Sequence, residues 1–138
     1  MGFDVELFVD KSLAEEYICV VCQSVASDVH ETECGHLFCR NCVSRLISKS
    51  SKNAVALCPH CRNKISWKTV HCSKYLDRKI SNLKVYCHLC NDFECKLLEL
   101  HDHQTKDCLD FKIDCQWKMY GCKQKIKRKN VDLHNKMH

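Results

Sequence analysis

Apolar residues recur at helical spacing in one stretch that lies between two cysteine-rich parts of the chain. In SKYLDRKISNLKVYC, Leu76, Ile80 and Leu83 follow one another at i, i+4 and i+7, which places them on one helical face. Ser73 precedes the pattern and is a residue type that caps helix N-termini. The sequence therefore predicts an amphipathic connecting helix that packs against a neighbouring unit.

Three shorter helices are predicted elsewhere. Leu46 lies in CVSRLISKSSKN, which predicts a short helix that ends in a loop rich in Ser, Lys and Asn. Leu100 stands three residues before His103, and Val131 stands three residues before His134. Residues at this spacing share a helical face, so each pair predicts a short helix that presents a histidine.

The composition argues against one large apolar core. Of 138 residues only 8% are aromatic, whereas 14 are Cys and 9 are His. A chain this rich in cysteine is stabilised either by disulfides, when it is secreted, or by zinc, when it is intracellular. Because the cysteines are interleaved with histidines at tight spacings, the sequence favours zinc.

The N-terminal sequence MGFDVELFVDKSLAEEY indicates where the protein resides. It is acidic and lacks the apolar run of a signal peptide, and Glu6 stands where a myristoylation motif requires Ser or Thr. No apolar run approaches the ~20 residues that cross a bilayer. We therefore expect an intracellular, cytoplasmic protein, with the nucleus as an open alternative and no membrane partner. The stretch can be the N-terminal part of a longer protein.

Charge is distributed unevenly along the chain. The formal net charge is +5, and residues 109–138 carry 8 basic and 3 acidic residues. Within this part, KQKIKRK holds five cations in seven residues: Lys123, Lys125, Lys127, Arg128 and Lys129. Any partner recognised by its negative charge would therefore bind at the C-terminal end.

Eight cysteine and histidine positions in the first half of the chain fall into four close pairs. Two thiolates two residues apart can occupy one edge of a tetrahedron around Zn²⁺. Four pairs therefore provide two zinc sites, one with four Cys and one with three Cys and one His. Spacing alone leaves open whether consecutive or alternate pairs share an ion. The pairs are Cys19 and Cys22, Cys34 and His36, Cys39 and Cys42, and Cys58 and Cys61.

The order and spacing of these residues resemble the RING finger at all eight positions. The series reads C-x2-C-x11-C-x-H-x2-C-x2-C-x15-C-P-x-C. LIM and PHD zinc domains place the histidine differently. The resemblance implies a cross-brace in which alternate pairs share an ion. One zinc ion would then be held by Cys19, Cys22, Cys39 and Cys42, and the other by Cys34, His36, Cys58 and Cys61.

Two further groups follow in the second half. They read Cys87-x2-Cys90-x12-His103-x4-Cys108 and Cys115-x6-Cys122-x11-His134-x3-His138. Each predicts a cysteine knuckle followed by a short helix that presents the remaining ligands. The YGC sequence that ends at Cys122 and the eleven-residue gap after it resemble TRAF-type zinc fingers. We therefore predict two more zinc ions, one in each group.

Alternatives exist within both fingers. In the first, Cys95 and His101 compete as ligands, but six residues separate His101 from Cys108, more than the usual three to five. His103 is therefore favoured. In the second, the family usually has Cys where His138 stands. Either His138 is the ligand, or the ligand lies beyond the end of this stretch.

The start MGFDVELF and the order RING, helix, two fingers resemble RING ligases of the neuregulin-receptor-degradation type. The expected fold is a small zinc-stabilised α+β protein with a cross-brace RING finger, a connecting helix and two ββα-like TRAF-type zinc fingers. Neither a coiled coil nor a TRAF-C domain is evident. The predicted domains are an N-terminal extension (1–17), the RING finger (18–66), a helical linker (67–86), finger 1 (87–108) and finger 2 (109–138).

The resemblance implies a function and the residues that perform it. RING fingers bind a ubiquitin-conjugating enzyme (E2) loaded with ubiquitin and promote ubiquitin transfer to a substrate lysine, with no covalent intermediate on the RING chain. Val21, Leu46 and Pro59 match the apolar E2-contact positions, and Arg62 matches the position that contacts E2 and ubiquitin together. The expected partners are thus an E2, ubiquitin and a protein substrate, with a homodimer as a further option.

Two other functions compete with this one. A non-catalytic adaptor would use the zinc units only to bind partners, and Val21, Pro59 and Arg62 argue against it. A nucleic-acid-binding finger protein is suggested by the basic run alone. Fingers that read DNA have shorter Cys–Cys gaps and occur in arrays, so the sequence disfavours nucleic acid as a partner.

Overall fold

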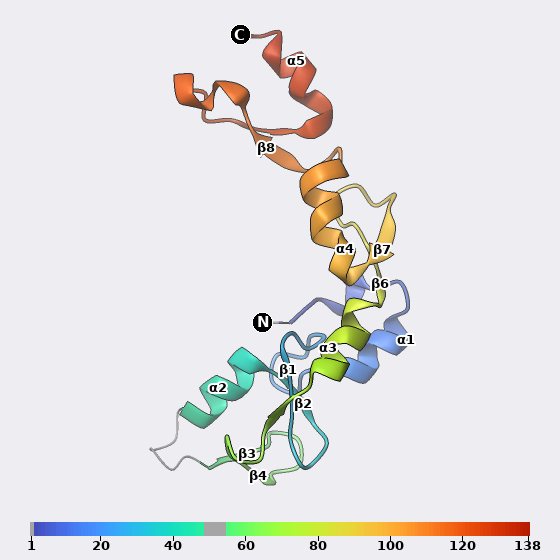
Figure 1. Ribbon diagram of the computed structural model, residues 1–138, viewed down its shortest axis with the longest axis vertical. Coiled ribbons are helices and arrows are strands. Elements are labelled where there is room, and N and C mark those ends of the chain that lie inside the picture. The colour runs from blue at the N-terminus through green and yellow to red at the C-terminus, as the bar shows by residue number, and fades with distance from the viewer. Residues whose placement is uncertain (1, 49–54) are drawn as a thin grey trace. The chain divides into compact units, whose positions relative to one another are not determined.

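The computed structural model describes residues 2–48 and 55–138, and the chain divides into two compact units, residues 1–84 and 85–138. Figure 1 shows the order of the elements along the chain. The predicted loop rich in Ser, Lys and Asn falls on residues 49–54 and lies outside the described residues. Among the described residues, no helix combines the length and apolar content required to cross a membrane.

The first unit alternates short helices with short strands. Its helices are the 3₁₀ helices η1 (Val5–Leu7) and η2 (Glu15–Tyr17) and the α-helices α1 (Lys11–Ala14), α2 (Arg40–Ser48) and α3 (Lys74–Ser81). Its strands are β1 (Val29–Glu31), β2 (Leu37–Cys39), β3 (Ala56–Leu57), β4 (Lys64–Ile65) and β5 (His71–Cys72).

A three-stranded antiparallel sheet, in the order β2-β1-β5, forms the centre of this unit. His30 on β1 lies opposite Phe38 on one side and Cys72 on the other. Both α2 and α3 contact β1. Strands β3 and β4 form a separate two-stranded ribbon, in which Ala56 pairs with Ile65. Each strand is short, so the sheet alone contributes little buried surface.

The predicted connecting helix is confirmed as α3, which begins at Lys74. Ser73 caps it by accepting a hydrogen bond from the Leu76 amide at 3.3 Å. Ile80 is only 2% exposed, so it is the main apolar anchor of the helix. Asp77 Oδ1 accepts a hydrogen bond from the Val29 amide at 2.9 Å, which fastens α3 to the central sheet.

The N-terminal segment packs within the first unit. Phe3 exchanges two main-chain hydrogen bonds of 2.8 Å with Val25, and Phe8 is only 1% exposed. The Val9 amide donates to the Lys84 carbonyl, so the segment also contacts the end of the connector. A Cβ atom on Gly2 would lie 2.2 Å from the Val25 carbonyl oxygen, which explains why glycine suits this position.

The second unit repeats a pattern of two strands and a helix. The first repeat contains β6 (Lys84–Tyr86), β7 (Glu94–Lys96), α4 (Leu97–Asp102) and a π-helical turn, η3 (His103–Asp107). The second contains β8 (Lys112–Asp114), the 3₁₀ helix η4 (Gln116–Tyr120), β9 (Lys125–Lys127), the 3₁₀ helix η5 (Arg128–Asn130) and α5 (Val131–Asn135). Strand β6 pairs with β7, and β8 with β9, which confirms two ββα-like fingers.

The apolar core of the second unit is very small. All of residues 85–138 are described, and among them Val85 and Leu100 are the only buried aliphatic side chains. The other buried residues are cysteines and histidines. Burying two aliphatic side chains contributes about 3–6 kcal/mol. That is far below the conformational entropy lost on ordering such a chain, so something other than apolar packing must stabilise this unit.

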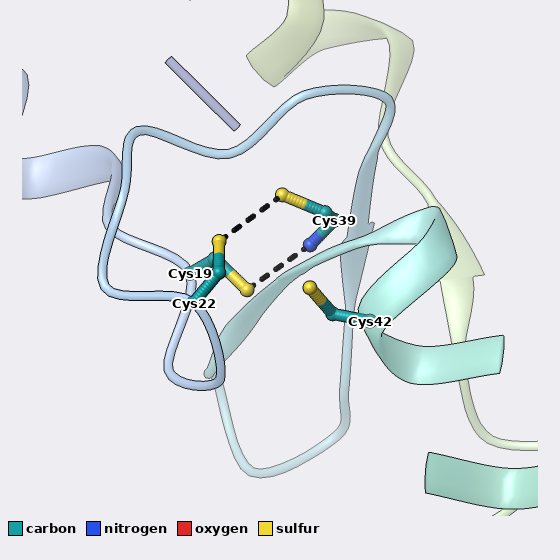
Figure 2. A group of neighbouring side chains, drawn as sticks. All are labelled: Cys19, Cys22, Cys39 and Cys42. Carbon is teal, nitrogen blue, oxygen red and sulfur yellow. Dashed lines mark hydrogen bonds between the residues drawn. The ribbon is translucent and has the colours of Figure 1, made fainter. Parts of the chain in front are cut away.

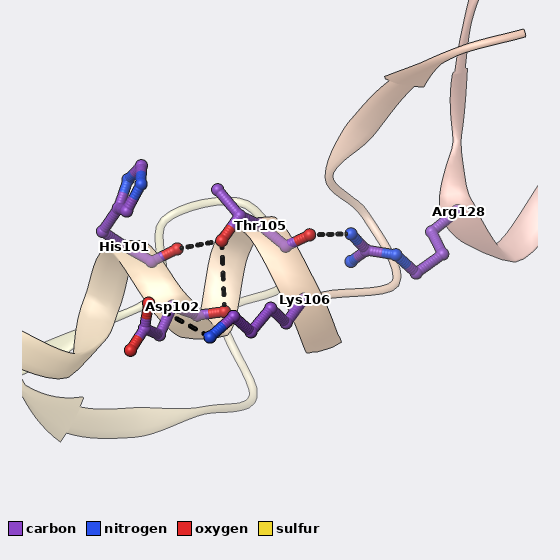
Figure 3. A network of polar contacts seen from close by, with 5 residues as sticks. All are labelled: His101, Asp102, Thr105, Lys106 and Arg128. Atoms are coloured by element: carbon purple, nitrogen blue, oxygen red, sulfur yellow. Dashed lines mark hydrogen bonds and ion pairs between the residues drawn. The ribbon is translucent and has the colours of Figure 1, made fainter.

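A single arginine joins the two fingers of the second unit. Figure 3 shows the Arg128 side chain reaching the end of the helical segment of finger 1. Its guanidinium donates to the main-chain carbonyls of Thr105 and Cys108. The Arg128 amide donates to the Phe111 carbonyl at 3.0 Å, and the guanidinium lies over the Phe111 ring. The carbonyls left unpaired at a helix end are thus satisfied by the other finger.

Candidate metal centres

The first cluster brings together four cysteines from three elements. Cys19 and Cys22 lie on the loop before β1, Cys39 ends β2, and Cys42 lies in the first turns of α2 (Figure 2). Their sulfur atoms all lie within 4.8 Å of one another. The Cys39 amide donates to Cys19 Sγ and the Ser27 amide donates to Cys39 Sγ, each at 3.3 Å. Such amide donors stabilise sulfur in its anionic form.

The pKa shifts of the thiols in this cluster indicate a site that suits a bound cation. The hydrogen bond from the Cys39 thiol lowers the pKa of the Cys19 thiol to about 4. The same bond raises the pKa of Cys39, and burial raises the pKa of Cys42 to about 11. One thiolate therefore forms readily, but further thiolates beside it repel each other. A divalent cation would remove that repulsion and let all four sulfurs ionise.

The second cluster contains Cys34, His36, Cys58 and Cys61, whose ligand atoms also lie within 4.8 Å of one another. His36 Nδ1 faces the site, 3.3 Å from Cys34 Sγ and 3.4 Å from Cys58 Sγ. Burial acts to raise the pKa of Cys34, but hydrogen bonds with the Thr32 hydroxyl and the His36 ring outweigh it and lower that pKa to about 6. The surroundings of Cys34 therefore favour its thiolate, the form of cysteine that binds a metal ion.

The third cluster contains Cys87, Cys90, His103 and Cys108. Cys87 Sγ lies 3.7 Å from Cys108 Sγ, and Cys90 Sγ lies 3.6 Å from His103 Nε2. The ring of Phe93 stacks on His103 with centroids 4.0 Å apart, which holds the imidazole in place. The competing residues Cys95 and His101 lie outside this cluster.

The fourth cluster contains Cys115, Cys122, His134 and His138. His134 Nε2 lies 3.2 Å from Cys115 Sγ and 3.5 Å from Cys122 Sγ. His138 Nε2 lies 3.1 Å from His134 Nε2 and 4.0 Å from Cys115 Sγ. The structure thus gathers His138 with the other three residues, although its side chain is exposed.

The donor sets of all four clusters fit zinc. Each offers four thiolate or imidazole donors, the number and type that a tetrahedral structural zinc site requires. All 14 cysteines lie within the described residues, and none forms a disulfide. The sulfurs of Cys22 and Cys39, for instance, are 3.8 Å apart, whereas a disulfide bond is ~2 Å long. The alternating pairing expected for a cross-brace matches the grouping in the structure.

A shallow hollow lies between the first and last zinc loops of the RING. It has a volume of about 330 Å³ and is lined by Ile18, Val20, Gln23, Pro59 and His60. Of the three predicted apolar contact residues, Pro59 therefore borders this hollow.

The other two predicted contact residues do not line the hollow. Val21 follows Val20 and is 42% exposed, and Leu46 on α2 is half-buried. An exposed valine beside a zinc loop is available to a partner, whereas Leu46 also contributes to packing of the unit. The part of the hollow formed by Ile18, Val20 and Gln23 could not be predicted from the sequence, because their approach to Pro59 depends on the folding of two loops about 40 residues apart.

Arg62 is exposed and has a left-handed backbone conformation, with φ of 62°. Its amide donates to the Cys58 carbonyl at 2.7 Å, which fixes the residue directly after Cys61, the last cysteine of the second cluster. Among the described residues, its guanidinium has no hydrogen-bond or ion-pair partner. The side chain is therefore available to contact another protein.

The basic run in finger 2 is largely occupied within the chain. Lys127 and Lys129 both pair with Asp110, at 3.1 and 2.7 Å, and Arg128 is engaged with main-chain carbonyls. The two lysines hold the pKa of Asp110 below its usual range. Three of the five cations in the run therefore have partners, which weakens the case for a phosphate-binding surface.

Several residues that support the clusters were not identified from the sequence. The Thr32 hydroxyl lies 2.8 Å from Cys34 Sγ and the side chain is only 4% exposed. Phe93 and the Ser27 amide support ligands in other clusters. The place of Thr32 two residues before Cys34 is the one sequence signal that could have indicated it, because its burial depends on the fold.

Comparison with known proteins agrees with this geometry. Residues 15–67 match the family described as zinc finger, C3HC4 type (RING finger). The chain is 31% identical over 129 residues to human TNF receptor-associated factor 5, covering 92% of this chain and 22% of that protein. It is 33% identical over 118 residues to mouse zinc finger TRAF-type-containing protein 1, covering 80% of this chain and 29% of that protein.

A third relative matches only the RING part. Human E3 ubiquitin ligase TRIM40 is 41% identical over 56 residues, which cover 41% of this chain and 22% of TRIM40. The chain thus spans less than a third of the length of each of these relatives. The comparisons support the RING finger in the first unit and relate nearly the whole chain to proteins of the TRAF type.

Proposed function

We propose that this chain, a TRAF-type RING zinc-finger protein, is a RING-type E3 ubiquitin ligase. It binds a ubiquitin-loaded E2 and promotes transfer of ubiquitin to substrate lysines in the cytoplasm. The observation that carries the proposal is the complete cross-brace, in which two Cys/His clusters flank a hollow bordered by Pro59 and leave Arg62 exposed. The activity named for TRIM40 over the RING region points the same way.

The four clusters would each hold one structural zinc ion. Zinc with four protein ligands has no open position, so it supplies rigidity and not an activated water. In the RING, the residues of both clusters fix the loops that carry Val20 and Pro59. The protein side chains around the hollow would then bind the E2 without having to become ordered first, which lowers the entropic cost of binding.

Pro59 at the hollow, and Val21 next to Val20, which lines it, would provide affinity. Val21 and Pro59 are exposed, and each would bury apolar surface against an E2 loop. Full burial of a side chain such as valine contributes ~1.5–3 kcal/mol, which suits a partner that binds and leaves repeatedly. A charge introduced at Val21 would be desolvated in the complex, so it should abolish E2 binding.

Arg62 would act once the ubiquitin-loaded E2 is bound. Its guanidinium presents several donors in one plane and is free to contact two acceptors together. Contacts made to E2 and ubiquitin together favour the closed conformation of the loaded E2, in which the thioester is held ready for attack. The substrate lysine amine then attacks the thioester carbonyl, an amide bond forms, and the E2 thiol leaves. No bond to this chain forms at any stage.

An adaptor function is the second candidate, and one observation favours it. The second unit exposes large apolar side chains, with Met119 at 94%, Tyr120 at 82% and Met137 at 80%. Exposed apolar groups on so small a unit are suited to binding a protein. They could serve a ligase, by presenting its substrate or forming a homodimer, or an adaptor that has no activity of its own.

The test is discharge of an E2–ubiquitin thioester to free lysine, followed with time in the presence of the zinc-loaded chain. A ligase accelerates discharge with several members of a broad E2 panel. Val21→Arg should remove the acceleration, whereas the control Leu98→Arg, which changes an exposed apolar residue of α4, should keep it. No acceleration with any E2, while the fold is intact, would favour the adaptor.

A further inference from the structure

Three metal-binding side chains gather on the central sheet, outside the four clusters. Asp28, His30 and Cys72 place a carboxylate oxygen, an imidazole nitrogen and a thiol sulfur within 4.8 Å of one another. His30 and Cys72 are direct cross-strand partners on β1 and β5, and Asp28 lies two residues before His30. His30 and Cys72 share one face of the sheet because they are paired across the two strands. Asp28 lies in the bend directly before β1, with φ of 50°, and this bend brings its carboxylate to the same place.

The imidazole ring of His30 is held in one orientation by its neighbours. His30 is 9% exposed, lies edge-on to Trp67 and has its Nδ1 atom 2.9 Å from the Asp28 carbonyl oxygen. Since a carbonyl oxygen only accepts, Nδ1 carries the proton, and Nε2 is left with a lone pair. A ring N–H that donates to a carbonyl is the usual support for a metal-binding histidine.

The other two donors are accessible and uncommitted. Asp28 and Cys72 are both exposed. Among the described residues, neither the Asp28 carboxylate nor the Cys72 sulfur has a hydrogen-bond or ion-pair partner. The backbone of Asp28 is nevertheless fixed, because its carbonyl also accepts from the Arg40 amide at 3.1 Å. The side chains can therefore turn toward an ion while the main chain stays in place.

We propose that Asp28, His30 and Cys72 form a fifth metal site that binds a zinc-like divalent cation reversibly. One thiolate, one imidazole and one carboxylate are a donor set suited to Zn²⁺ rather than to Ca²⁺ or Mg²⁺, which prefer oxygen ligands. Three protein ligands leave the fourth position to water. The ion is therefore held less tightly than in the four clusters and exchanges with the surrounding zinc.

Such an ion would tie the RING to the connector. Asp28 and His30 belong to the RING sheet, whereas Cys72 lies on β5, directly before Ser73, which caps α3. Binding would add to the stability of the first unit only when zinc is plentiful. The site would also protect the Cys72 thiol, because a metal-bound thiolate is unavailable to an alkylating reagent.

The test compares the wild-type chain with Cys72→Ser and Asp28→Asn, two near-isosteric changes at exposed positions. Each zinc-loaded protein is equilibrated with free Zn²⁺ and its bound zinc is counted. Alkylation of Cys72 by iodoacetamide is followed by peptide mass spectrometry with and without added Zn²⁺. Cys95, the other cysteine outside the four clusters, is the internal reference.

The proposal predicts one zinc ion fewer per chain in Cys72→Ser than in the wild type. It also predicts that Zn²⁺ at ten times its Kd slows alkylation of wild-type Cys72 about tenfold, through mass action. Asp28→Asn should lose most of that protection. Equal zinc counts in wild type and Cys72→Ser, or protection of equal size in Asp28→Asn, would overturn the three-residue site.

Discussion

The guanidinium of Arg128 in finger 2 donates a hydrogen bond to the main-chain carbonyl of Thr105 in finger 1 (Figure 3). The same group also donates to the Cys108 carbonyl and, at 3.5 Å, to the Gln104 carbonyl, so one side chain satisfies three acceptors of the other finger. Because the second unit has so few buried aliphatic residues, this contact matters more here than it would in a large core. It makes the two fingers parts of one folded unit.

Replacing Arg128 by alanine should therefore destabilise the second unit. Hydrogen bonds from a charged donor contribute about 1.5–3 kcal/mol each, although partial exposure reduces this value. We expect a loss of about 2 kcal/mol in the free energy of unfolding of zinc-loaded protein, measured by denaturant titration.

Lys123→Ala is the matched control for Arg128. Lys123 belongs to the same basic run, is exposed and has no partner among the described residues. Its replacement should change the free energy of unfolding by less than about 0.5 kcal/mol. If the two variants were equally stable, the link between the fingers would contribute nothing.

Removing zinc should unfold both units. Structural zinc contributes ~10–16 kcal/mol of binding free energy per site, as much as the whole net stability of a typical folded domain, ~5–15 kcal/mol. A strong chelator should abolish the folded circular dichroism spectrum, and added Zn²⁺ should restore it. A spectrum that survives complete removal of the metal would contradict the assignment of the clusters as structural zinc sites.

Zinc should leave finger 2 first as the pH falls. Protons compete with zinc for the ligands, so the stability that zinc provides is complete at high pH and is lost on acidification. Finger 2 offers two thiolates and two imidazoles, and its His138 is exposed, whereas the first RING cluster offers four thiolates, none of them on an exposed residue. Because protons and water reach the exposed imidazole of His138 most readily, we expect finger 2 to release its ion at the higher pH.

This order can be followed by NMR, with resonances near each cluster recorded in zinc-loaded protein at decreasing pH. His138→Cys, which gives finger 2 a third thiolate, should shift its zinc release to lower pH. Release from the RING clusters before finger 2 would contradict the predicted order.

Thr32 should increase the zinc affinity of the second RING cluster without binding the ion itself. Its hydroxyl lies 2.8 Å from Cys34 Sγ and accepts from the His36 amide at 3.3 Å. Loss of such a supporting contact typically weakens metal affinity about 10–100-fold. Thr32→Val should show this loss in competition with a chromophoric chelator. The control Thr69→Val removes a hydroxyl whose hydrogen bonds, within the described part of the chain, are with Ser66, and it should leave zinc affinity unchanged.

Much of the local structure was predictable because it depends on local sequence. The helix α3 follows from the spacing of Leu76 and Ile80 and from the capping residue Ser73, and all three lie where predicted. Close pairs such as Cys19 and Cys22 also depend on local sequence, because a tight turn brings their two sulfurs to one metal site. The grouping of alternate pairs could not be derived from spacing and came from the RING resemblance. The individual ligand assignments stay predictions, although the structure brings the same residues together.

Other features depend on contacts between distant residues. Arg128 meets Thr105 across 23 positions, and no local pattern distinguishes it from the lysines beside it. The pairing of Phe3 with Val25, and of His30 with Cys72, likewise depends on tertiary structure. The bounds of the five predicted domains also stay predictions, whereas the structure itself divides into two compact units.

The most direct test of the ligase proposal compares E2 binding with ubiquitin discharge in Arg62→Ala. Arg62 is exposed and has no partner among the described residues, so its loss should leave the fold and E2 affinity nearly unchanged. If it acts only in the closed state, lysine discharge should fall about tenfold to a hundredfold, which corresponds to ~1.4–2.7 kcal/mol. Discharge that continues at the wild-type rate, with E2 binding intact, would contradict the role of Arg62 and the catalytic account built on it.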